Sequence, residues 1–363
     1  MKFLKSIPQK ELKNKRVLLR TDFNVPIGKN GKISGNEDWR IKAALPTIKY
    51  LLKQKAKIIL LSHLGRPKGK VIEKLRLDPV QNKLSRLLGI SIKKTPDCIG
   101  KDVEKAVRKM KAGKILMLEN LRFHEEEENN NEKFAKKLAK LGDIYINDAF
   151  SDSHRKHASI AGITKYLPSY AGLLMEKELE LMSDAIRPDH PAIAIIGGAK
   201  LETKLPAVNA LAKIYDHVLV GGMIANEILN TSIKNEIASN VVLPKVGSLE
   251  KQKYFDIGEN AIGKFSELIQ IAKFIIWNGP MGKFEENEYS QGTRGIIKAI
   301  KIAYNCGARV LIGGGETIYA VQKFAPELMD KKIKGFNIST GGGAMLDFLA
   351  GKRLPGIEAL KNF

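Results

Sequence analysis

Five short apolar runs in the second half of the chain each end at glycine, and this repeated pattern constrains the fold more than any other feature. The first run, Ala192–Ile196, is followed by Gly197 and Gly198 and then by helix-forming residues, so it predicts a strand that turns into a helix. Four further stretches repeat the pattern: Asp216–Met223, Phe274–Glu285, Arg309–Thr317 and Asn337–Leu346. Together they predict one parallel sheet, and open α/β sheets bind their ligands at the carboxyl edge.

The first of these turns has the composition of a phosphate site. Gly197 and Gly198 would let the backbone approach a ligand closely, and the N–H groups that open the following helix would face the anion. Lys200 and Lys204 add positive charge one helical turn apart.

The first half of the chain ends its predicted strands in polar side chains instead of glycine. The predicted strands are Arg16–Pro26, Ala56–Pro67, Lys114–Phe123 and Asp143–Phe150, and a helix with Arg40 at its start is predicted over Ile41–Lys53 despite Pro46. The side chains at these ends are Arg20, Asp22, Asn24, Ser62, His63, Arg66, Glu119, Asn120, Arg122, His154, Arg155 and His157. Guanidinium groups bind phosphate and carboxylate through two hydrogen bonds, so the sequence predicts a second site, for a small polyanion.

Two neighbouring features receive a simpler interpretation. His154 and His157 are three residues apart, but no third His or Cys ligand is nearby in the sequence, so anion contact or a structural hydrogen bond is preferred to a metal site. The acidic, Asn-rich run Glu125–Asn131 is predicted to be a solvated turn before the next helix, without a function.

Composition sets the wider limits. A chain of 363 residues suits two domains, and a formal net charge of +22 favours anionic partners, which could be a phosphorylated metabolite, a nucleotide, a nucleic acid or a membrane surface. Much of the excess is lysine in stretches such as Lys101–Lys114, expected to be a solvated surface. Cys98 and Cys306 are far apart and predict reduced thiols. No apolar run resembles a signal peptide or a membrane span, so we expect a cytoplasmic protein.

The connection between the halves has a helical pattern. Apolar residues recur at helical spacing over Tyr166–Ile186, and the proline-rich stretch Arg187–Pro191 ends the pattern, so a bridging helix and a hinge are predicted here. Sequence patterns typical of helices and strands are weaker between Asn230 and Gln270. Within this segment, Val241–Pro244 predicts a short strand and Asp256–Leu268 predicts a turn and a helix. A last helix is expected over Ala344–Leu349, followed by a turn at Lys352–Gly356.

Motifs spread over both halves closely resemble the phosphoglycerate kinase family. They are RxDxNVP (Arg20–Pro26), SHLGRP (Ser62–Pro67), LENLRF (Leu118–Phe123), NDAFxxxHRxH (Asn147–His157), GGAKxxxK (Gly197–Lys204), WNGPMGxFE (Trp277–Glu285), GGGxT (Gly313–Thr317) and STGGGAxLxFLxGKxLPG (Ser339–Gly356). The resemblance implies two Rossmann-like, three-layer α/β domains with parallel sheets, joined by a hinge helix. The expected parts are an N-terminal 3-phosphoglycerate domain (1–165), the hinge helix (166–190), a C-terminal nucleotide domain (191–345) and a tail (346–363) that returns towards the N-terminal domain.

The resemblance also implies a role for individual residues. Substrate binding falls to Arg20, Asp22, Asn24, Arg40, His63, Arg66, Arg122 and Arg155. Binding of ATP or ADP falls to Gly197, Gly198, Lys200, Lys204, Gly221, Asn278, Glu285, Gly315, Glu316, Thr317 and Gly343. Glu316 is expected to hold the Mg²⁺ that accompanies the nucleotide, although the family usually has Asp there, and the segment 230–270 is shorter than in most members. A monomer that binds neither nucleic acid nor membrane is expected.

The implied reaction is the reversible transfer of the terminal phosphoryl group of ATP to the carboxylate of 3-phosphoglycerate. That carboxylate is already ionised at neutral pH, so the reaction needs positioning and charge neutralisation instead of a general base. The expected catalytic residues are Arg40, Lys204, Gly341 and Gly342. Neither the P-loop string G-x-x-x-x-G-K-[ST] nor a dinucleotide-binding G-x-G-x-x-G occurs. A basic nucleic-acid-binding protein of α/β fold remains the alternative.

Overall fold

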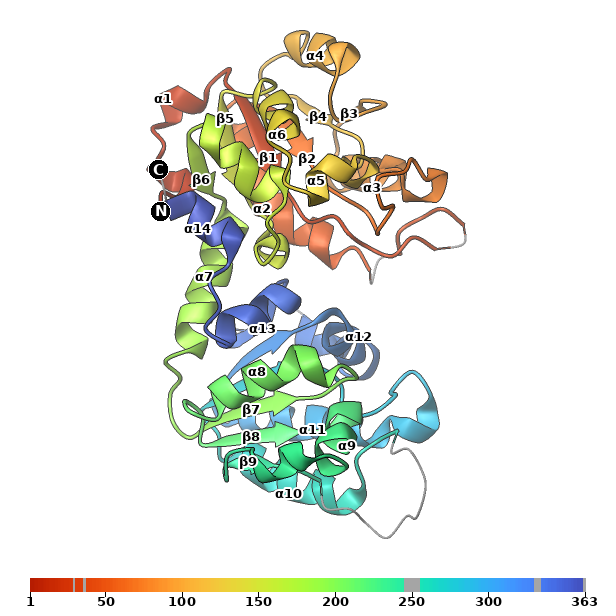
Figure 1. The fold of residues 1–363 in the computed structure, drawn as a ribbon, viewed down its shortest axis with the longest axis vertical. Coiled ribbons are helices and arrows are strands. Elements are labelled where there is room, and N and C mark those ends of the chain that lie inside the picture. Colours follow the sequence, from red (N-terminus) through yellow and green to blue (C-terminus); the bar gives the residue numbers. More distant parts are fainter. Residues whose placement is uncertain (29, 35–36, 245–254, 330–333, 362–363) are drawn as a thin grey trace. The chain divides into compact units, whose positions relative to one another are not determined.

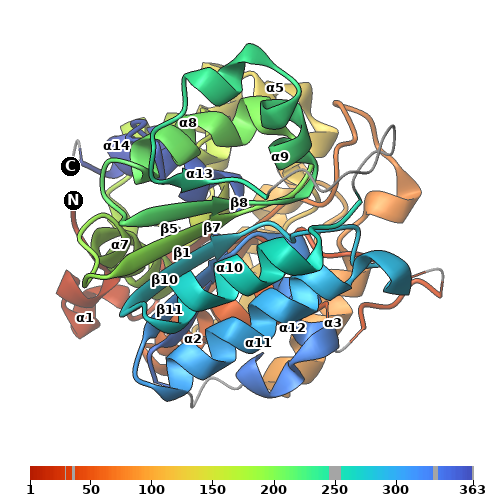
Figure 2. The same ribbon diagram turned by 90° about the horizontal axis from the view of Figure 1, so that it is seen from below.

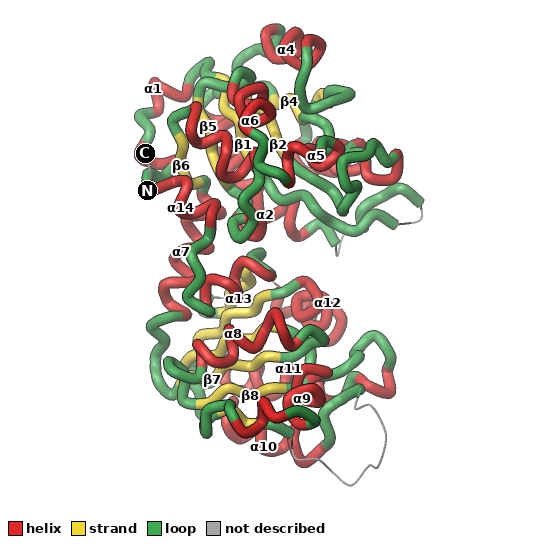
Figure 3. The backbone as a smooth tube through the Cα atoms, in the orientation of Figure 1, coloured by secondary structure: helices red, strands yellow, loops and turns green. Residues whose placement is uncertain are grey.

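The computed structural model describes residues 1–363 except 29, 35–36, 245–254, 330–333 and 362–363. The chain divides into two compact units, one formed by Met1–Glu178 with Arg353–Phe363 and the other by Leu179–Lys352. It passes from the first unit to the second within helix α7 (Leu173–Ala185) and rejoins the first unit after Lys352 (Figures 1 and 3).

The first unit is built on a six-stranded sheet in which every neighbouring pair is parallel. In sheet order the strands are β3 (Lys93–Lys94), β4 (Ile115–Met117), β2 (Lys57–Leu61), β1 (Arg16–Arg20), β5 (Ile144–Asn147) and β6 (Ser169–Ala171). The central strands are almost continuously buried because helices cover both faces, which explains their unbroken apolar sequences.

Alternating residues of these strands divide between the two faces. Val17 and Leu19 of β1 share one core cluster with apolar residues of α2 and α3, and the opposite face meets α5, α6 and a π-helical turn over Ala158–Gly162. The α-helices of this unit are α1 (Gln9–Leu12), α2 (Trp39–Lys53), α3 (Asp78–Leu88), α4 (Lys101–Arg108), α5 (Glu125–Glu128), α6 (Glu132–Ala139), the start of α7, and α14 (Pro355–Lys361). Short 3₁₀ turns lie at Leu4–Ser6, Glu73–Leu75, Leu121–Phe123, Phe150–Asp152 and Ile163–Tyr166.

The second unit repeats the plan with a second six-stranded parallel sheet. Its strands, in sheet order, are β12 (Phe336–Ser339), β11 (Arg309–Gly313), β10 (Phe274–Asn278), β7 (Ala192–Ile196), β8 (His217–Val220) and β9 (Val241–Val242). The strand order reverses between β10 and β7, and open α/β sheets place their ligand crevice at such a switch point.

Helices cover both faces of this sheet (Figure 2). Helices α8, α9 and α13 lie on one face, and α10, α11 and α12 lie on the other. Their bounds are α8 (Leu201–Leu211), α9 (Gly222–Leu229), α10 (Glu259–Gln270), α11 (Gln291–Asn305), α12 (Gly315–Phe324) and α13 (Gly343–Leu349), with 3₁₀ turns at Ser232–Asn235, Asn287–Tyr289 and Pro326–Met329. Two three-layer α/β units with parallel sheets confirm the predicted fold class.

Several predicted elements are also confirmed. Helix α2 runs through Pro46, β9 and α10 occupy the positions predicted in the weakly patterned segment, and α13 follows its glycine turn. Part of that segment, 245–254, lies outside the described residues. Cys98 and Cys306 are free thiols, the first buried and the second exposed. Among the described residues, no helix combines the length and the apolar character that crossing a bilayer would demand.

Other predicted elements were wrong in extent. Strand β1 stops at Arg20 instead of continuing to Pro26, because its neighbour β2 ends at Leu61 and offers no further backbone partner. The hydroxyl of Ser62 takes over the pairing by donating to the Thr21 carbonyl (2.9 Å) and accepting from the Phe23 N–H (3.0 Å). Asp22 and Asn24 therefore lie in a loop and not on a strand.

Strands β4 and β5 are likewise shorter than predicted, whereas β2 ends directly before Ser62 as predicted. Two further segments differ from the prediction in type. The start of the predicted bridging helix forms the edge strand β6, whose neighbour β5 donates from Tyr145 N–H to the Pro168 carbonyl (2.9 Å). Near the C-terminus, Pro355 begins α14 instead of belonging to a turn, which suits a residue whose missing N–H costs nothing in the first helical turn. The Gly356 N–H donates to the Ser153 carbonyl (2.8 Å) within the first unit.

Candidate active site

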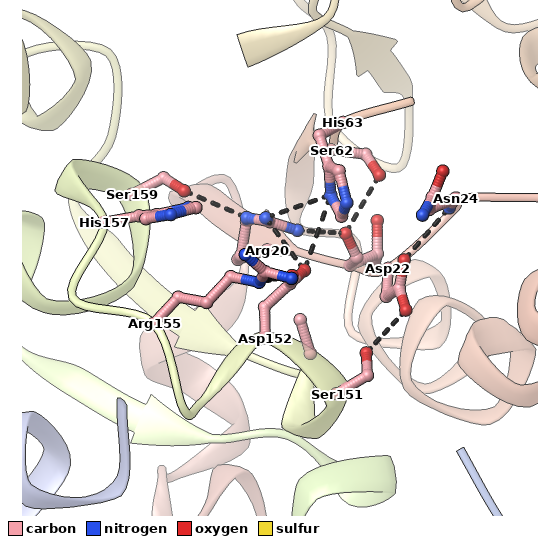
Figure 4. Close-up of polar contacts among 12 residues, drawn as sticks. Arg20, Asp22, Asn24, Ser62, His63, Ser151, Asp152, Arg155, His157 and Ser159 are labelled. Atoms are coloured by element: carbon pink, nitrogen blue, oxygen red, sulfur yellow. Dashed lines mark hydrogen bonds and ion pairs between the residues drawn. The ribbon is translucent and has the colours of Figure 1, made fainter. Parts of the chain in front are cut away.

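Four of the predicted side chains gather around a buried carboxylate beyond the carboxyl ends of β1, β2, β4 and β5, and Figure 4 shows part of this cluster. They are Arg20, His63, Arg122 and Arg155. Arg20 is fully buried; its Nε donates to Ser159 Oγ (2.9 Å) and its NH2 to Asp152 Oδ2 (3.1 Å). His63 Nδ1 lies 3.4 Å from the same oxygen. The other oxygen of Asp152 lies 3.4 Å from Arg122 NH2 and 3.7 Å from Arg155 Nε.

These charges shift one another's pKa values. Burial lowers the pKa of His63 to about 4, and Arg122 and Arg20 add to that effect against the opposing pull of Asp152. Burial alone would raise the pKa of Asp152, but His63 and the surrounding guanidinium groups hold it well below its ordinary value. At neutral pH the cluster therefore contains a neutral imidazole, an ionised carboxylate and several guanidinium cations.

Two further predicted residues pair at the rim of the cluster. Arg40, the second residue of α2, forms an ion pair with Asp22, which also accepts a hydrogen bond from Ser151 Oγ (2.5 Å). Arg40 stacks over the Trp39 ring at 4.5 Å. Asn24 Oδ1 accepts from the Gly65 N–H (2.9 Å), which ties the loop after β1 to the loop after β2.

Arg66 differs from the other arginines because it is exposed and, among the described residues, takes part in no hydrogen bond or ion pair. Arg155 is one third exposed, whereas Arg20 and Arg122 are buried. The structure thus brings Arg20, His63, Arg122 and Arg155 into direct contact with one carboxylate, and leaves Arg66 with an unused guanidinium group.

The acidic run Glu125–Asn131 is not a solvated turn, so that prediction was wrong. Four of its residues form α5, and Glu127 is fully buried, accepting from the Ser159 N–H (2.9 Å) and hydroxyl (2.6 Å). Ser159 in turn accepts from Arg20, so Glu127 braces a residue of the cluster. Asn131 caps α6 by accepting from the Phe134 N–H (3.1 Å).

Sequence reasoning missed Asp152, Glu127 and Ser159. Asp152 falls within the NDAFxxxHRxH motif just after β5 and three residues before Arg155, a position that could have drawn attention to it. Glu127 gave no signal, because it is one of four consecutive glutamates and only packing shows which of them is buried.

The closely spaced His154 and His157 raise the question of a metal site. In the described part of the chain, the groups of three potential ligands within 4.8 Å are Asp97 with Cys98 and His124, and Asp22 with His63 and Asp152. Neither group contains His154 or His157. The second group lies among arginines, whose positive charge opposes a cation.

In the second unit the predicted glycines follow the strands that flank the switch point. Gly197 and Gly198 follow β7, Gly279 follows β10, and Gly314 and Gly315 follow β11. A Cβ atom on Gly197 would lie 2.1 Å from the Pro280 carbonyl oxygen, and Gly198 has φ +94°, so close packing and backbone conformation require glycine at these two positions.

The N–H groups of Gly197 and Gly198 form hydrogen bonds within the protein. They donate to the carbonyls of Asn278 (3.0 Å) and Pro280 (2.9 Å), because the two glycine turns pack against each other. Gly221 has a similar packing role, since its N–H donates to the Ile196 carbonyl (3.0 Å) and a Cβ there would lie 2.5 Å from Met281 Sδ.

Other backbone donors remain available at this edge. Among the described residues, the N–H groups of Gly315, Gly342 and Gly343 donate no hydrogen bond. Gly315 opens α12, and Gly343 opens α13 after the turn that begins at Gly341. Thr317 Oγ1 accepts from the Gly279 N–H (2.6 Å), which fixes the start of α12 against the turn after β10.

Lys204 is the best-positioned cation of this unit. Its Nζ donates to the carbonyls of Gly197 and Asn278 (3.4 Å for the latter), and burial lowers its pKa to about 8 although the nearby Glu316 carboxylate raises it. Lys200 is the exposed residue preceding α8. Asn278 is buried, and within the described part of the chain its amide nitrogen has no hydrogen-bond partner, which marks it as a donor available to a ligand.

Glu316 and Glu285 are exposed, and within the described residues neither carboxylate forms a hydrogen bond or an ion pair. Glu316 lies in the first turn of α12, near Lys204 and Gly198. Mg²⁺ prefers hard oxygen ligands and keeps several of its waters, so the open carboxylate fits this ion. The free backbone N–H groups beside it fit phosphate oxygens.

Comparison with known proteins points to one family. A sequence profile described as "Phosphoglycerate kinase" matches residues 7–248 and 229–352. Phosphoglycerate kinases of Dictyoglomus turgidum and Pelotomaculum thermopropionicum are 44% and 41% identical, with 99% and 98% of this chain and of each relative covered. The crystal structure of phosphoglycerate kinase from Pyrococcus horikoshii matches with a TM-score of 0.84 at 32% identity, covering 99% of this chain and 98% of that one. A family match over nearly the whole chain, two relatives more than 40% identical over almost their full length, and a solved relative with the same fold lead to one conclusion: this chain belongs to the phosphoglycerate kinase family.

Proposed function

We propose that the first unit holds 3-phosphoglycerate and the second holds ATP or ADP for the family's reversible phosphoryl transfer. The observation that carries this division is the contrast in chemistry at the two carboxyl edges. One edge carries Arg20, Arg40, His63, Arg66, Arg122 and Arg155, with Asp22 and Asn24 beside them. The other carries glycine turns, free N–H groups and Lys204.

On the substrate side, the side chains of Arg66 and Arg155 are more exposed than that of Arg40, so we expect them to be the first to meet an entering phosphate ester. Arg40 is the residue proposed to contact the carboxylate that receives the phosphoryl group. Its ion pair with Asp22 orients the guanidinium group, which a transferring phosphoryl needs in place before the reaction.

On the nucleotide side, Lys204 and the free N–H groups of Gly342 and Gly343 would neutralise the negative charge that develops on the moving phosphoryl group. Gly341 sets the turn that presents them. Lys200, Gly197, Gly198, Gly221, Asn278, Glu285, Gly315 and Thr317 complete the proposed nucleotide site.

Mg²⁺ would be held by Glu316 together with the nucleotide phosphates, and when bound it would neutralise phosphate charge. Nothing in the proposed reaction requires a side chain to accept a proton, because the acceptor carboxylate is ionised at neutral pH.

Transfer requires the two bound substrates to meet with water excluded, since the acyl phosphate product hydrolyses readily. We propose α7 as the hinge of that closure, because the chain passes between the two units within this helix. We also propose a cytoplasmic monomer that binds neither nucleic acid nor membrane.

The test is a coupled assay with 3-phosphoglycerate, ATP and Mg²⁺. Saturable formation of the acyl phosphate, dependent on all three, is the expected result. Absence of turnover, together with nucleic-acid binding that weakens steeply with salt, would instead support the basic nucleic-acid binder. Small-angle X-ray scattering tests the hinge, because closure predicts a smaller radius of gyration with both substrates bound than with either alone.

A further inference from the structure

Asp152 occupies the centre of the basic cluster in a way that the proposed reaction does not require. The side chain is 6% exposed, and its two oxygens are shared between Arg20 and His63 on one side and Arg122 and Arg155 on the other. Figure 4 shows the carboxylate among Arg20, Arg155 and His63. A small anion with two oxygens directed at separate guanidinium groups is also how a phosphate ester would bind to this cluster.

The carboxylate has an evident role when no ligand is bound. Arg20 and Arg122 are buried, and Arg155 lies close to both, so without Asp152 like charges would face one another away from water. The low pKa of Asp152, which burial opposes and His63 and the arginines produce, keeps this counter-charge present throughout the neutral range.

The same carboxylate must oppose an incoming anion. Arg155 and Arg122 would be shared between Asp152 and a bound phosphate, and two negative charges within a few ångströms repel each other strongly where water is scarce. The repulsion grows with the charge of the ligand, so it affects a dianionic phosphate more than a monoanionic carboxylate.

We propose that Asp152 is an internal counter-anion that holds the arginine cluster together in the free protein and competes with the phosphate group of the substrate. Asp152 stabilises the free unit and at the same time lowers its affinity for the substrate. The assignment of 3-phosphoglycerate rests on the proposed function, whereas the competition with phosphate rests on the charges of the cluster alone.

The experiment compares Asp152→Asn with the wild type by calorimetric titration of inorganic phosphate, 3-phosphoglycerate and acetate at low ionic strength. We expect the dissociation constants for phosphate and 3-phosphoglycerate to fall by roughly tenfold or more, as removal of one unit charge a few ångströms away implies. Acetate should gain less. The matched control is Asp143→Asn, which removes the partner of Arg16 at the start of β5, and should change none of these constants.

Thermal unfolding provides the second readout. The free Asp152→Asn protein should unfold at a lower temperature than the wild type. Added phosphate should raise the unfolding temperature of the variant more than that of the wild type. A variant that folds only when phosphate is present during purification would also support the proposal, because phosphate would then replace the lost carboxylate as the counter-charge of the arginines. A folded variant with unchanged or weaker phosphate binding would overturn the proposal, as would a variant that stays unfolded even with phosphate present.

These outcomes separate the proposal from the function on which it rests. If phosphate binds more tightly to Asp152→Asn but 3-phosphoglycerate is neither bound nor phosphorylated, the counter-anion stands and the assigned substrate fails. If the wild type turns over 3-phosphoglycerate normally and the variant shows no gain for either ligand, the function stands and the counter-anion fails.

Discussion

The two candidate sites occupy the same position in two similar sheets, yet they are made from different parts of the chain. In the first unit, long charged side chains meet over the carboxyl edge and neutralise one another through Asp152 and Asp22. In the second unit, backbone turns form most of the edge, and Lys204 is the cation placed deepest within it.

The difference has a physical cause. A small, highly charged substrate needs many cations, and a protein that buries several cations must supply internal anions to remain stable. A nucleotide is larger and brings its own metal, so its site needs room for close backbone approach and only a few charges. We therefore expect side-chain changes to alter stability and affinity in the first unit, and rate in the second.

The largest expected effect tests the structural side of the first unit. Arg20→Met should lower the free energy of unfolding by about 3–5 kcal/mol, because it leaves the buried Asp152 short of a partner. Arg66→Ala should leave stability unchanged and raise the KM for 3-phosphoglycerate, since Arg66 is exposed and unpaired among the described residues. Denaturant unfolding and steady-state kinetics check the pair. Equal losses of unfolding free energy in the two variants would mean that burial does not determine how much each arginine contributes to stability.

The next effect tests the catalytic side of the second unit. Lys204→Ala should lower kcat by about 10² or more, because the positive charge is lost where phosphoryl charge develops. Binding of 3-phosphoglycerate, measured by direct titration, should stay unchanged, and Lys213→Ala, an exposed lysine just beyond the C-terminal end of the same helix, is the matched control. Near wild-type turnover at saturating substrates would remove Lys204 from the mechanism.

Acidification should reveal the effect of the buried His63 imidazole on the stability of the protein. The folded pKa of His63 is lowered to about 4, below the ordinary value of about 6.5, so its contribution to stability is present above about pH 6.5 and is lost as the pH falls towards 4. Relative to His63→Gln, the wild type should lose roughly 2 kcal/mol between about pH 7 and about pH 4.5.

Urea unfolding at a series of pH values measures this difference, with His190→Gln, an exposed histidine of the second unit, as the control for replacing histidine. If the wild type and His63→Gln show parallel pH profiles, the imidazole is not held neutral in the folded protein.

The smallest expected effect concerns the metal. Glu316→Gln should raise the Mg²⁺ concentration for half-maximal rate by roughly tenfold, because one of the charged oxygen ligands is lost, whereas Glu316→Asp should show a smaller shift. Rates measured over a range of free Mg²⁺ check this, and Glu288→Gln, an exposed carboxylate of the second unit outside the proposed site, is the matched control. An unchanged Mg²⁺ dependence in Glu316→Gln would leave Glu316 with only the role of an acid at a helix start.

Local sequence patterns were sufficient for much of this molecule. Unbroken apolar runs followed by glycine or by polar residues predicted parallel strands and the edge at which ligands bind, because a strand buried on both faces requires such a composition. The recurrence of cationic residues at strand ends predicted one cluster of Arg20, Arg40, His63, Arg66, Arg122 and Arg155. The structure places four of these six around Asp152, without Arg40 and Arg66.

The remaining features depend on contacts between residues far apart in the sequence. Strand β1 ends at Arg20 because its neighbour β2 ends at Leu61, and no local pattern reports the length of a neighbour. The sequence predicts that the backbone comes close to a ligand at Gly197 and Gly198, and only the structure shows that the turn after β10 accepts hydrogen bonds from their N–H groups. Among four consecutive glutamates only the packing of α5 selects Glu127 for burial, and only the meeting of three loops makes Asp152 the counter-charge of the cluster. The sequence by itself thus determined which kinds of residue end each strand, because composition and periodicity are local. Tertiary structure decided which donors stay free and which charges cancel, because both depend on distances that only the folded chain sets.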